Sequence, residues 1–350
     1  MPIPGPAKSS PPGPRILIFC TTMDIPRPPK WKRVLKRTLL SLAILLAVAL
    51  ASGFIIQQRR DADFRTTHPP SGSFVSVEGR RIHFRQSGDG EFTFILEAGL
   101  GDYSGSWGTL ESSLAGIGRV FVYDRAGLGW SDASPHPRTA RQIARELHEA
   151  LEAAHVRKPY ILVGHSLGGI SQTLYAMEYP GDVAGLLLID PSHKDQFVKL
   201  PPPPASPVWV MTQVSRAARF GLPQLLFQSS DPVQNQTSHM LATGAELRAA
   251  LNATENWGDR AIRLGTIPIT VLTAGDDTAM PGQSAAERKA SWEIWKNLHD
   301  ELIASSSSEI RRHIVVEGAS HYIQRTHPAA VVDAARELVN RIKTQTPCTH

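Results

Sequence analysis

The residues best able to do chemistry lie in the pentapeptide GHSLG at residues 164–168. This G-x-S-x-G pattern directly follows the apolar run YILV, which predicts a strand, and directly precedes a helical stretch at 167–178. In that context the serine occupies a strained turn with its hydroxyl above the sheet, and the flanking glycines leave room for the turn. We therefore predict that Ser166 is a nucleophile rather than part of an ordinary glycine-rich loop.

A serine hydroxyl is a weak nucleophile until a base accepts its proton, and histidine most often does so. Where such a serine turn occurs, the order along the chain is serine, then acid, then histidine. His321 suits this order because it follows the last predicted strand by five residues, in a loop that contains Gly318. His313 would lie inside that strand and His327 would start the last helix, so we predict His321 as the base.

The acid that orients this histidine and stabilises its charged form has three candidates at the ends of predicted strands. Asp190 follows the apolar run LLLI, and Asp276 and Asp277 follow the run ITVL. The carboxyl ends of parallel strands share one edge of a sheet, so either loop can reach His321 there. Asp190 and Asp277 stand as equal alternatives on the sequence, with Asp276 behind both.

A carbonyl attacked by this serine would need two backbone donors for its developing negative charge. One is the N–H of Leu167, directly after the serine. We predict the second at Leu100, in the glycine-rich loop after the run FTFILE. The chain has only two cysteines, Cys20 and Cys348, at its extreme ends, which indicates neither a disulfide framework nor a cysteine-based metal site.

The rest of the chain supplies the elements that must hold these residues. Short apolar runs alternate with helical patterns from Phe74 onward, which is typical of a mostly parallel sheet covered by helices on both faces. The runs predicted as strands are 74–77, 81–85, 92–97, 119–123, 160–163, 184–189, 269–272 and 312–316. The predicted helices are 139–155, 167–178 and 329–342. We therefore predict one large α/β domain at 73–345 with an eight-stranded sheet.

One stretch, at about 192–266, breaks this alternation. It contains the proline run at 201–204 and several helical patches, and it lies between two predicted strands without an obvious strand of its own. We interpret it as an inserted helical cap. Such a cap would cover the carboxyl ends of the strands, where open α/β sheets bind their ligands.

The N-terminal region, residues 1–37, is rich in Pro, Gly and Ser, and we predict that it is disordered. Within it, six of the eleven residues at 27–37 are Lys or Arg. The net charge of +5 is therefore concentrated there, and the remaining chain shows no basic groove. This pattern argues against a nucleic-acid-binding protein.

A segment at 38–57 follows, and its first nineteen residues, TLLSLAILLAVALASGFII, carry no charge. That is close to the ~20 residues that cross a bilayer. The cations on its N-terminal side predict a cytoplasmic N-terminus and a domain outside, tethered through a polar linker at 58–72. The alternative is a signal peptide cleaved near Ala51, with a secreted product. The apolar run continues through 54–56 and favours the uncleaved anchor.

The chain resembles the α/β-hydrolase superfamily from about Phe74 to its last helix. The resemblance rests on five segments: LEAGLGDYSGSW at 96–107, YDRAGLGWSD at 123–132, PYILVGHSLGG at 159–169, AGLLLIDPSHKDQ at 184–196 and EGASHYIQRTHP at 317–328. Together they are similar to bacterial hydrolases of the esterase and proline-iminopeptidase-like group. The resemblance implies a serine esterase or related activity without a metal or an organic cofactor.

Two departures from the family pattern affect the site. Many relatives begin the oxyanion loop with His-Gly, whereas residues 98–99 are Ala-Gly here. The acid after the ITVL strand usually follows a Gly-x-x-Asp spacing, whereas Gly275 is followed directly by Asp276 and Asp277, which keeps Asp190 in contention. The family's Asp-Arg-x-Gly-x-Gly-x-Ser segment matches residues 124–131, and we expect it to form a structural loop beside the site.

The leading hypothesis is hydrolysis of a small-molecule ester through an acyl-enzyme on Ser166. The same fold implies aminopeptidase, thioesterase, lactonase and C–C hydrolase activities as alternatives. These activities differ in the cap and share the same serine, histidine and acid, the catalytic triad. Haloalkane dehalogenases and epoxide hydrolases need an aspartate where this chain has Ser166. A different class, a non-catalytic binding module tethered to a membrane, would keep the fold without turnover.

Overall fold

The computed structural model describes residue 1 and residues 29–201, 205–223, 229–252, 257–258, 260–275 and 283–345; of residues 205–209 it describes the backbone alone. Eight strands form one sheet in the order β1-β2-β4-β3-β5-β6-β7-β8. Their bounds are β1 Ser73–Val77, β2 Arg80–Ser87, β3 Thr93–Glu97, β4 Arg119–Tyr123, β5 Tyr160–His165, β6 Val183–Ile189, β7 Ile269–Ala274 and β8 Arg311–Val316. Strand β2 runs antiparallel to β1 and β4, and the other pairs are parallel, which confirms the predicted fold class.

The central strands are apolar along their whole length because both faces of the sheet are covered. Every residue of β3, β5 and β7 is buried. This is the continuous pattern expected of parallel strands and not the alternation of a half-exposed sheet. The register pairs Glu97 with Gly164 and His165 with Ile189. The carboxyl ends of β3, β5 and β6 therefore lie side by side.

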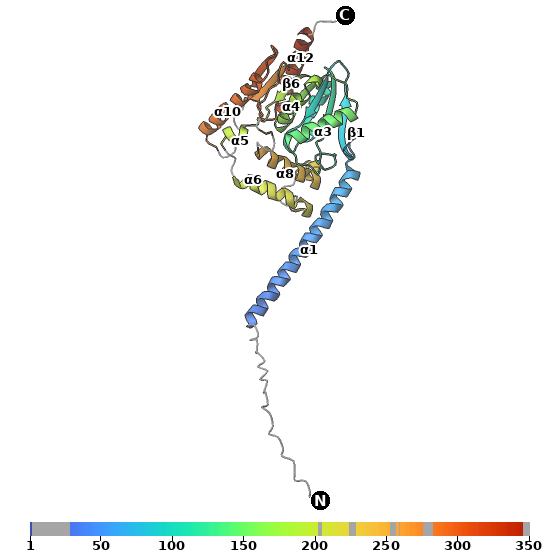
Figure 1. Ribbon diagram of the computed structural model, residues 1–350, viewed down its shortest axis with the longest axis vertical. Coiled ribbons are helices and arrows are strands. Elements are labelled where there is room, and N and C mark those ends of the chain that lie inside the picture. Colours follow the sequence, from blue (N-terminus) through green and yellow to red (C-terminus); the bar gives the residue numbers. More distant parts are fainter. Residues whose placement is uncertain are drawn as a thin grey trace. The chain divides into compact units, whose positions relative to one another are not determined.

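Helices pack on both faces of this sheet (Figure 1). On one face, α2 (Thr109–Ala115) and α12 (Pro328–Gln345) share a hydrophobic core with β3 and β5. On the other face, α3 (Ala140–Ala153) packs in a second core. The remaining core elements are η1 Ser104–Trp107, α4 Leu167–Glu178, η2 Pro180–Asp182, α10 Ala285–Ala304 and α11 Ile323–Thr326. Helix α10, which was not among the predicted helices, begins with a capping box between Ser284 and Glu287.

The described chain between β6 and β7 consists of helices joined by turns and coil, and the described residues there include no strand beyond a single β-bridge at Gly265. Its elements are α5 Gln196–Lys199, α6 Ala205–Arg216, η3 Ala217–Phe220, η4 Pro232–Asn235 and α8 Thr237–Leu251. Helices α6 and α8 pack against each other, with Gly244 so close to Ser215 that a Cβ at Gly244 would clash. We call residues 192–266 the cap region, as in the sequence prediction.

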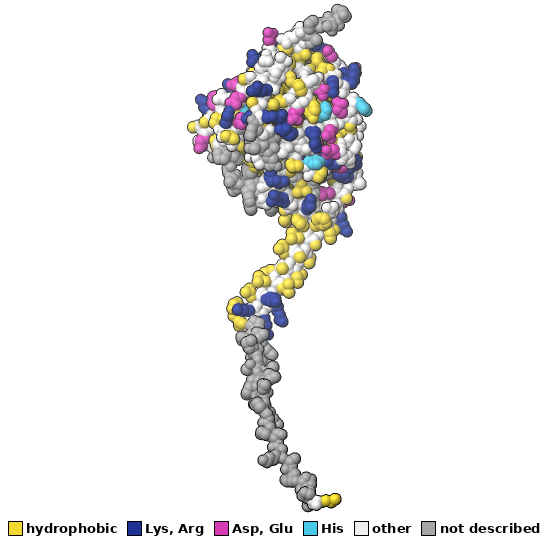
Figure 2. Space-filling view, viewed as in Figure 1, with side chains coloured by type: hydrophobic (Ala, Val, Ile, Leu, Met, Phe, Trp, Pro, Cys, Tyr) yellow, Lys and Arg dark blue, Asp and Glu magenta, His cyan; other side chains and the backbone are white. Residues whose placement is uncertain are grey.

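The N-terminal helix α1 runs from Lys30 to Thr67 and contains the one apolar stretch, among the described helices, that is long enough to cross a membrane. Figure 2 shows apolar side chains along much of α1. The chain divides into two compact units, residues 1–49 and 50–350. The predicted disorder to residue 37 is wrong from Lys30 onward, and residues 2–28 lie outside the described part.

The prediction of a polar linker at 58–72 is also wrong, because this segment continues α1 as far as Thr67 and packs against the rest of the domain. Tertiary contacts explain the difference. Phe64 is buried, stacks on His68 and lies 6.5 Å from Trp130 between ring centroids. The side chain of Asp61 accepts a hydrogen bond from the N–H of Thr237, at the start of α8. A polar composition alone does not reveal such contacts.

Candidate active site

Ser166 lies in the turn between β5 and α4 with φ 51° and ψ −121°, a backbone conformation that costs a non-glycine residue free energy. Glycines at both sides make the turn possible. A Cβ on Gly164 would come within 2.7 Å of the carbonyl oxygen of Gly168, and one on Gly168 would clash with the carbonyl of Glu97. The serine is thus held at the end of the sheet, as its motif predicts.

Two side chains from other strand ends meet this serine. The Nε2 atom of His321 lies 3.0 Å from the Oγ of Ser166, and its Nδ1 atom lies 2.5 Å from the Oδ2 of Asp190. Asp190 directly follows β6 and has a positive φ of 42°. With Nδ1 donating to the carboxylate, Nε2 is left as the acceptor for the serine hydroxyl. The three residues form a continuous hydrogen-bonded chain.

The carboxylate of Asp190 is itself held in place. Its Oδ1 accepts hydrogen bonds of 3.0 Å from the N–H of Ala274 at the end of β7 and from the Nε1 of Trp295 on α10. Burial alone would raise the pKa of Asp190, but the hydrogen bond and charge of His321 outweigh it and keep that pKa below its usual value. The carboxylate therefore stays ionised at neutral pH.

The other carboxylate candidates, Asp276 and Asp277, lie outside the described residues. The competing histidine His313 is bonded elsewhere, to Thr273 at 2.6 Å and to Asp300 at 2.6 Å. Sequence reasoning missed Trp295, which holds the acid. The capping box at the start of α10 and the many helix-forming residues that follow it could have indicated a helix there.

A second histidine, His165, lies directly beside the site. Burial, with help from the charge of His321, lowers the pKa of His165 to about 3, so the ring is neutral at ordinary pH. Its Nε2 donates to the carbonyl oxygen of His321 at 3.0 Å. This hydrogen bond ties the backbone of the His321 loop to the residue before Ser166.

The loop after β3, residues 98–102, lies against the serine turn and is here called the oxyanion loop. A Cβ on Gly99 would come within 3.2 Å of the Cβ of Ser166 and 2.9 Å of the Nδ1 of His165, so a side chain there would have to displace one of them. Leu167, the other predicted donor, is the first residue of α4. The two predicted backbone donors therefore belong to segments that flank Ser166.

Arg125 binds the backbone of this loop, although the sequence indicated only a structural segment at 124–131. Its Nη1 and Nη2 atoms donate to the carbonyls of Ala98 and Gly99 at 2.5 and 2.7 Å. Its Nε and Nη2 donate to the carboxylate of Glu246, on the cap helix α8, at 2.7 and 2.8 Å. Neither these hydrogen bonds nor the part played by Glu246 was evident from the sequence.

Both charges of this pair are buried. Burial would raise the pKa of Glu246, but Arg125 outweighs it and holds that pKa below its usual value. Burial would lower the pKa of Arg125, and Glu246 raises it instead. Glu97 lies 4.0 Å from the same guanidinium, yet burial still raises the pKa of Glu97 to about 7. At neutral pH, Glu246 is therefore the main counter-charge of Arg125.

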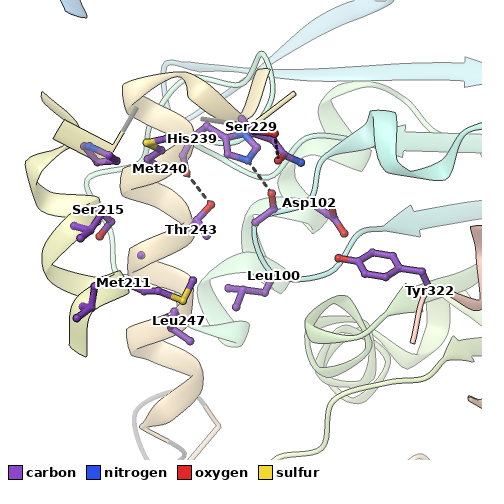
Figure 3. Close-up of a pocket in the computed structure, with 16 residues that line it drawn as sticks. Leu100, Asp102, Met211, Ser215, Ser229, His239, Met240, Thr243, Leu247 and Tyr322 are labelled. Carbon is purple, nitrogen blue, oxygen red and sulfur yellow. Dashed lines mark hydrogen bonds between the residues drawn. The ribbon is translucent and has the colours of Figure 1, made fainter. Parts of the chain in front are cut away.

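A cavity of about 560 Å³ opens beside the oxyanion loop, between the core and the cap region (Figure 3). Leu100, Asp102 and Tyr322 line its core side. The cap helices α6 and α8 supply mainly apolar residues to the opposite wall, including Val210, Met211, Val214, Met240 and Leu247. This space is large enough for a small organic molecule with an apolar part.

Two groups of side chains in the described part of the chain have metal-ligand spacing, and lysines bind the carboxylates of both. In the group formed by His148, Glu152 and Asp182, the ammonium of Lys158 lies 2.8 and 2.9 Å from the two carboxylates. The other group consists of His193, Asp195 and Glu301. Lysines contact both of its carboxylates at 2.8 Å or less. Ammonium groups thus already neutralise these carboxylates.

Comparisons with known proteins agree with this architecture. The model of the Alpha/beta hydrolase family matches residues 94–334. The YqjL protein of Bacillus subtilis strain 168 is 29% identical over 259 residues, which cover 73% of this chain and 87% of that protein.

Two solved structures have the same fold. A thermophilic esterase from Thermogutta terrifontis superposes with a TM-score of 0.54 at 20% identity, covering 78% of this chain and 99% of its own. The epoxide hydrolase CorEH superposes with a TM-score of 0.55 at 18% identity, with the same coverage.

Proposed function

We propose that this chain, which belongs to the alpha/beta hydrolase family, is a serine hydrolase that cleaves an ester through an acyl-enzyme on Ser166. The observation that carries the proposal is the hydrogen-bonded series from Ser166 through His321 to Asp190. A serine in a strained turn, a base at 3.0 Å and an ionised acid behind the base are the parts that nucleophilic acyl transfer requires.

Each residue then has a defined part in the reaction. The Nε2 of His321 accepts the Ser166 proton while Oγ attacks the ester carbonyl, and Asp190 stabilises the imidazolium that forms. The N–H groups of Leu100 and Leu167 receive the carbonyl oxygen as it becomes negative. His321 next protonates the departing alcohol. Water, deprotonated by the same histidine, then releases the acid and restores Ser166.

The chemistry of the nucleophile separates the proposal from other activities found on this fold. An epoxide hydrolase of this fold forms its ester on an aspartate, whereas this chain has Ser166 at the turn. The apolar cap wall of the cavity supports a substrate with an apolar acyl or alcohol group. Aminopeptidase, lactonase or C–C hydrolase activity would use the same three residues and is separated by substrate assays.

The test is hydrolysis of p-nitrophenyl esters of two to twelve acyl carbons by the full chain in detergent. We expect Ser166→Ala to lower kcat by at least about 10³-fold, since removing a triad nucleophile costs up to roughly 10⁶-fold. Ser113→Ala, an exposed serine on α2, is the matched control. If Ser166→Ala retained parental turnover, the proposal would fail. A folded parent protein that turned over no ester, lactone or aminoacyl substrate would favour a binding module.

We also propose that α1 anchors the protein in a membrane through residues 38–57. The α/β domain, which we call the catalytic unit, would then lie outside the cytoplasm. The charge-free stretch and the cations that precede it support this orientation. Carbonate-resistant sedimentation with the membrane fraction, and protease access to the catalytic unit from outside intact cells, are the expected results. A mature N-terminus near Ala51 in the soluble fraction would support a cleaved signal instead.

A further inference from the structure

The cap helix α8 presents one line of side chains to the oxyanion loop. His239, Thr243 and Glu246 are spaced by four and three residues, so they lie on the same face of the helix. His239 and Glu246 are buried, with 2% and 0% of their surface exposed. Figure 3 shows His239 and Thr243 facing the segment that carries Leu100 and Asp102.

Two of these side chains bind the same loop residue, Gly101, from both of its polar groups. The N–H of Gly101 donates to the Oε2 of Glu246 at 3.3 Å. The carbonyl of Gly101 accepts from the Nε2 of His239 at 2.8 Å, the contact drawn in Figure 3. The proton on His239 is fixed at Nε2, because its Nδ1 accepts from the N–H of Gly129 at 3.2 Å.

Gly101 is also in close van der Waals contact with α8. Gly101 has a φ of 64°, which glycine adopts at little cost. A Cβ at this position would come within 2.7 Å of the Cγ2 of Thr243 and 2.9 Å of its Oγ1. A larger residue would fit only if the Thr243 side chain, α8 or the loop moved. The loop therefore contacts α8 through the close approach of Gly101 to the Thr243 side chain as well as through hydrogen bonds.

Arg125 fixes the peptide unit between Gly99 and Leu100, which carries the predicted oxyanion donor. Its Nη2 binds the carbonyl oxygen of Gly99, and that carbonyl shares a peptide unit with the N–H of Leu100. In a trans peptide the C=O and N–H groups point in opposite directions. Holding the oxygen of Gly99 toward Arg125 therefore fixes the N–H of Leu100 away from it. Glu246 in turn holds Arg125 through two hydrogen bonds.

We propose that α8 of the cap sets the geometry of the oxyanion hole, with Glu246, His239 and Arg125 as positioning residues for the N–H of Leu100. The inference rests on the proposed serine hydrolysis. In this arrangement the cap both bounds the substrate cavity and holds one of the two catalytic donors in position. A donor prepositioned in a water-poor site stabilises the oxyanion without reorganising during the reaction.

The central test is Glu246→Gln in the full chain, which keeps the size of the side chain but removes its charge. Loss of one oxyanion donor costs about 10²–10³-fold in kcat, so a misdirected donor should cost about 10–100-fold, with KM changed less than about two-fold. The affinity for an alkyl boronic acid, which forms a tetrahedral anion on the serine, should fall by the same factor as kcat.

The matched control is Glu146→Gln. Glu146 is a buried glutamate that pairs with Arg138 at 2.7 Å and has no hydrogen bond to the oxyanion loop. We expect it to keep parental kcat and boronate affinity even if its melting temperature falls. An equal loss of kcat in both variants would mean that any buried charge change disturbs the site, and the proposal would be overturned.

Two outcomes separate this inference from the proposed function. If Ser166→Ala keeps activity, the serine mechanism fails whatever Glu246→Gln does. If Ser166→Ala is inactive while folded Glu246→Gln keeps parental kcat and boronate affinity, only the positioning role fails. Should Glu246→Gln not fold, His239→Phe removes the bonds to Gly101 and Gly129 without changing charge. It should lower kcat by about 10-fold at constant KM, and parental kcat would overturn the proposal.

Discussion

Two buried arginine–glutamate pairs lie close together in this protein and differ in what they hold. Arg125 and Glu246 pair at 2.7 Å, as do Arg138 and Glu146, and every one of these side chains is at most 5% exposed. Arg125, Arg138 and Glu146 even border the same small cavity, of about 10 Å³. The two pairs therefore share chemistry and environment.

Their connections separate them. Arg138 and Glu146 are eight residues apart, and the carboxylate also accepts from Ser134, Gln142 and, on β2, Arg80. This pair therefore fixes the start of α3 against β2 and, within the described part of the chain, makes no hydrogen bond to the oxyanion loop. Arg125 and Glu246 are 121 residues apart and join the loop after β4 to the cap. A buried ion pair is therefore not by itself a sign of function. Its role depends on the backbone that it fixes.

The largest difference should come from replacing the two arginines. Arg125→Met removes the guanidinium donors of the Ala98 and Gly99 carbonyls and leaves the buried carboxylate of Glu246 with the N–H of Gly101 but without its counter-charge. We expect a loss of about 3–5 kcal/mol in unfolding free energy and of about 10³-fold in kcat. Arg138→Met should cost less stability, because Glu146 keeps Arg80 as a cationic partner and Ser134 and Gln142 as hydrogen-bond donors. Its kcat should stay within about three-fold.

Urea unfolding and ester hydrolysis of both arginine variants check this prediction. A parental kcat in folded Arg125→Met would remove the distinction between the two pairs. An activity loss in Arg138→Met as large as in Arg125→Met would remove it as well.

A smaller effect should appear in the pH dependence of stability. It arises from Glu97, a second carboxylate that lies 4.0 Å from Arg125. The pKa of Glu97 is about 7 in the folded protein against an ordinary value of 4.5. Ionised Glu97 therefore costs stability, and this cost is absent below pH 4.5, grows as pH rises and is complete above pH 7.

The variant Glu97→Gln should remove that cost. Relative to the parent it should gain stability between pH 4.5 and 8, on the order of 3 kcal/mol at roughly 1.4 kcal/mol per pH unit. Urea unfolding at pH 4.5, 6 and 8 measures the gain. A stability difference that stays constant across this range would contradict the raised pKa.

The smallest effect should come from adding one methyl group to the loop. Gly101→Ala brings a Cβ to 2.7 Å from Thr243, whereas Gly108→Ala has a similar positive φ of 52° and nothing within 4 Å. Gly101→Ala should lose about 1–2 kcal/mol for its positive φ, and Gly108→Ala at least as much, because its ψ of −130° lies outside the left-handed helical region. Only Gly101→Ala should also lose kcat, by several-fold, because the loop must shift from α8. Equal kcat values in the two variants would show that the loop tolerates this shift.

Local patterns in the sequence account for much of the fold and for two residues of the site. The run YILV, the GHSLG turn and the following helix predict β5, Ser166 and α4, because strand, turn and helix there are neighbours along the chain. The His321 loop was found in the same way. The linker prediction at 58–72 was wrong, because a polar composition does not show that Phe64 is buried.

The parts that the sequence left open depend on long-range contacts. Asp190 and Asp277 both follow strands, and only the three-dimensional arrangement reveals that Ala274 and Trp295 bind the Asp190 carboxylate while His321 faces its other oxygen. Glu246 looks like an ordinary helix residue in the sequence. Its partner is 121 residues away, and no periodicity connects the two.

The most direct test of the account is fluorophosphonate labelling of the full chain, followed by peptide mass mapping. We predict a phosphonyl group on Ser166, absent from Ser166→Ala, with labelling strongly slowed in Asp190→Asn and unchanged in Asp277→Asn. Label on another residue, or no label on folded protein, would contradict the serine mechanism. Slow labelling in Asp277→Asn, with a parental rate in Asp190→Asn, would show that the acid is the other aspartate.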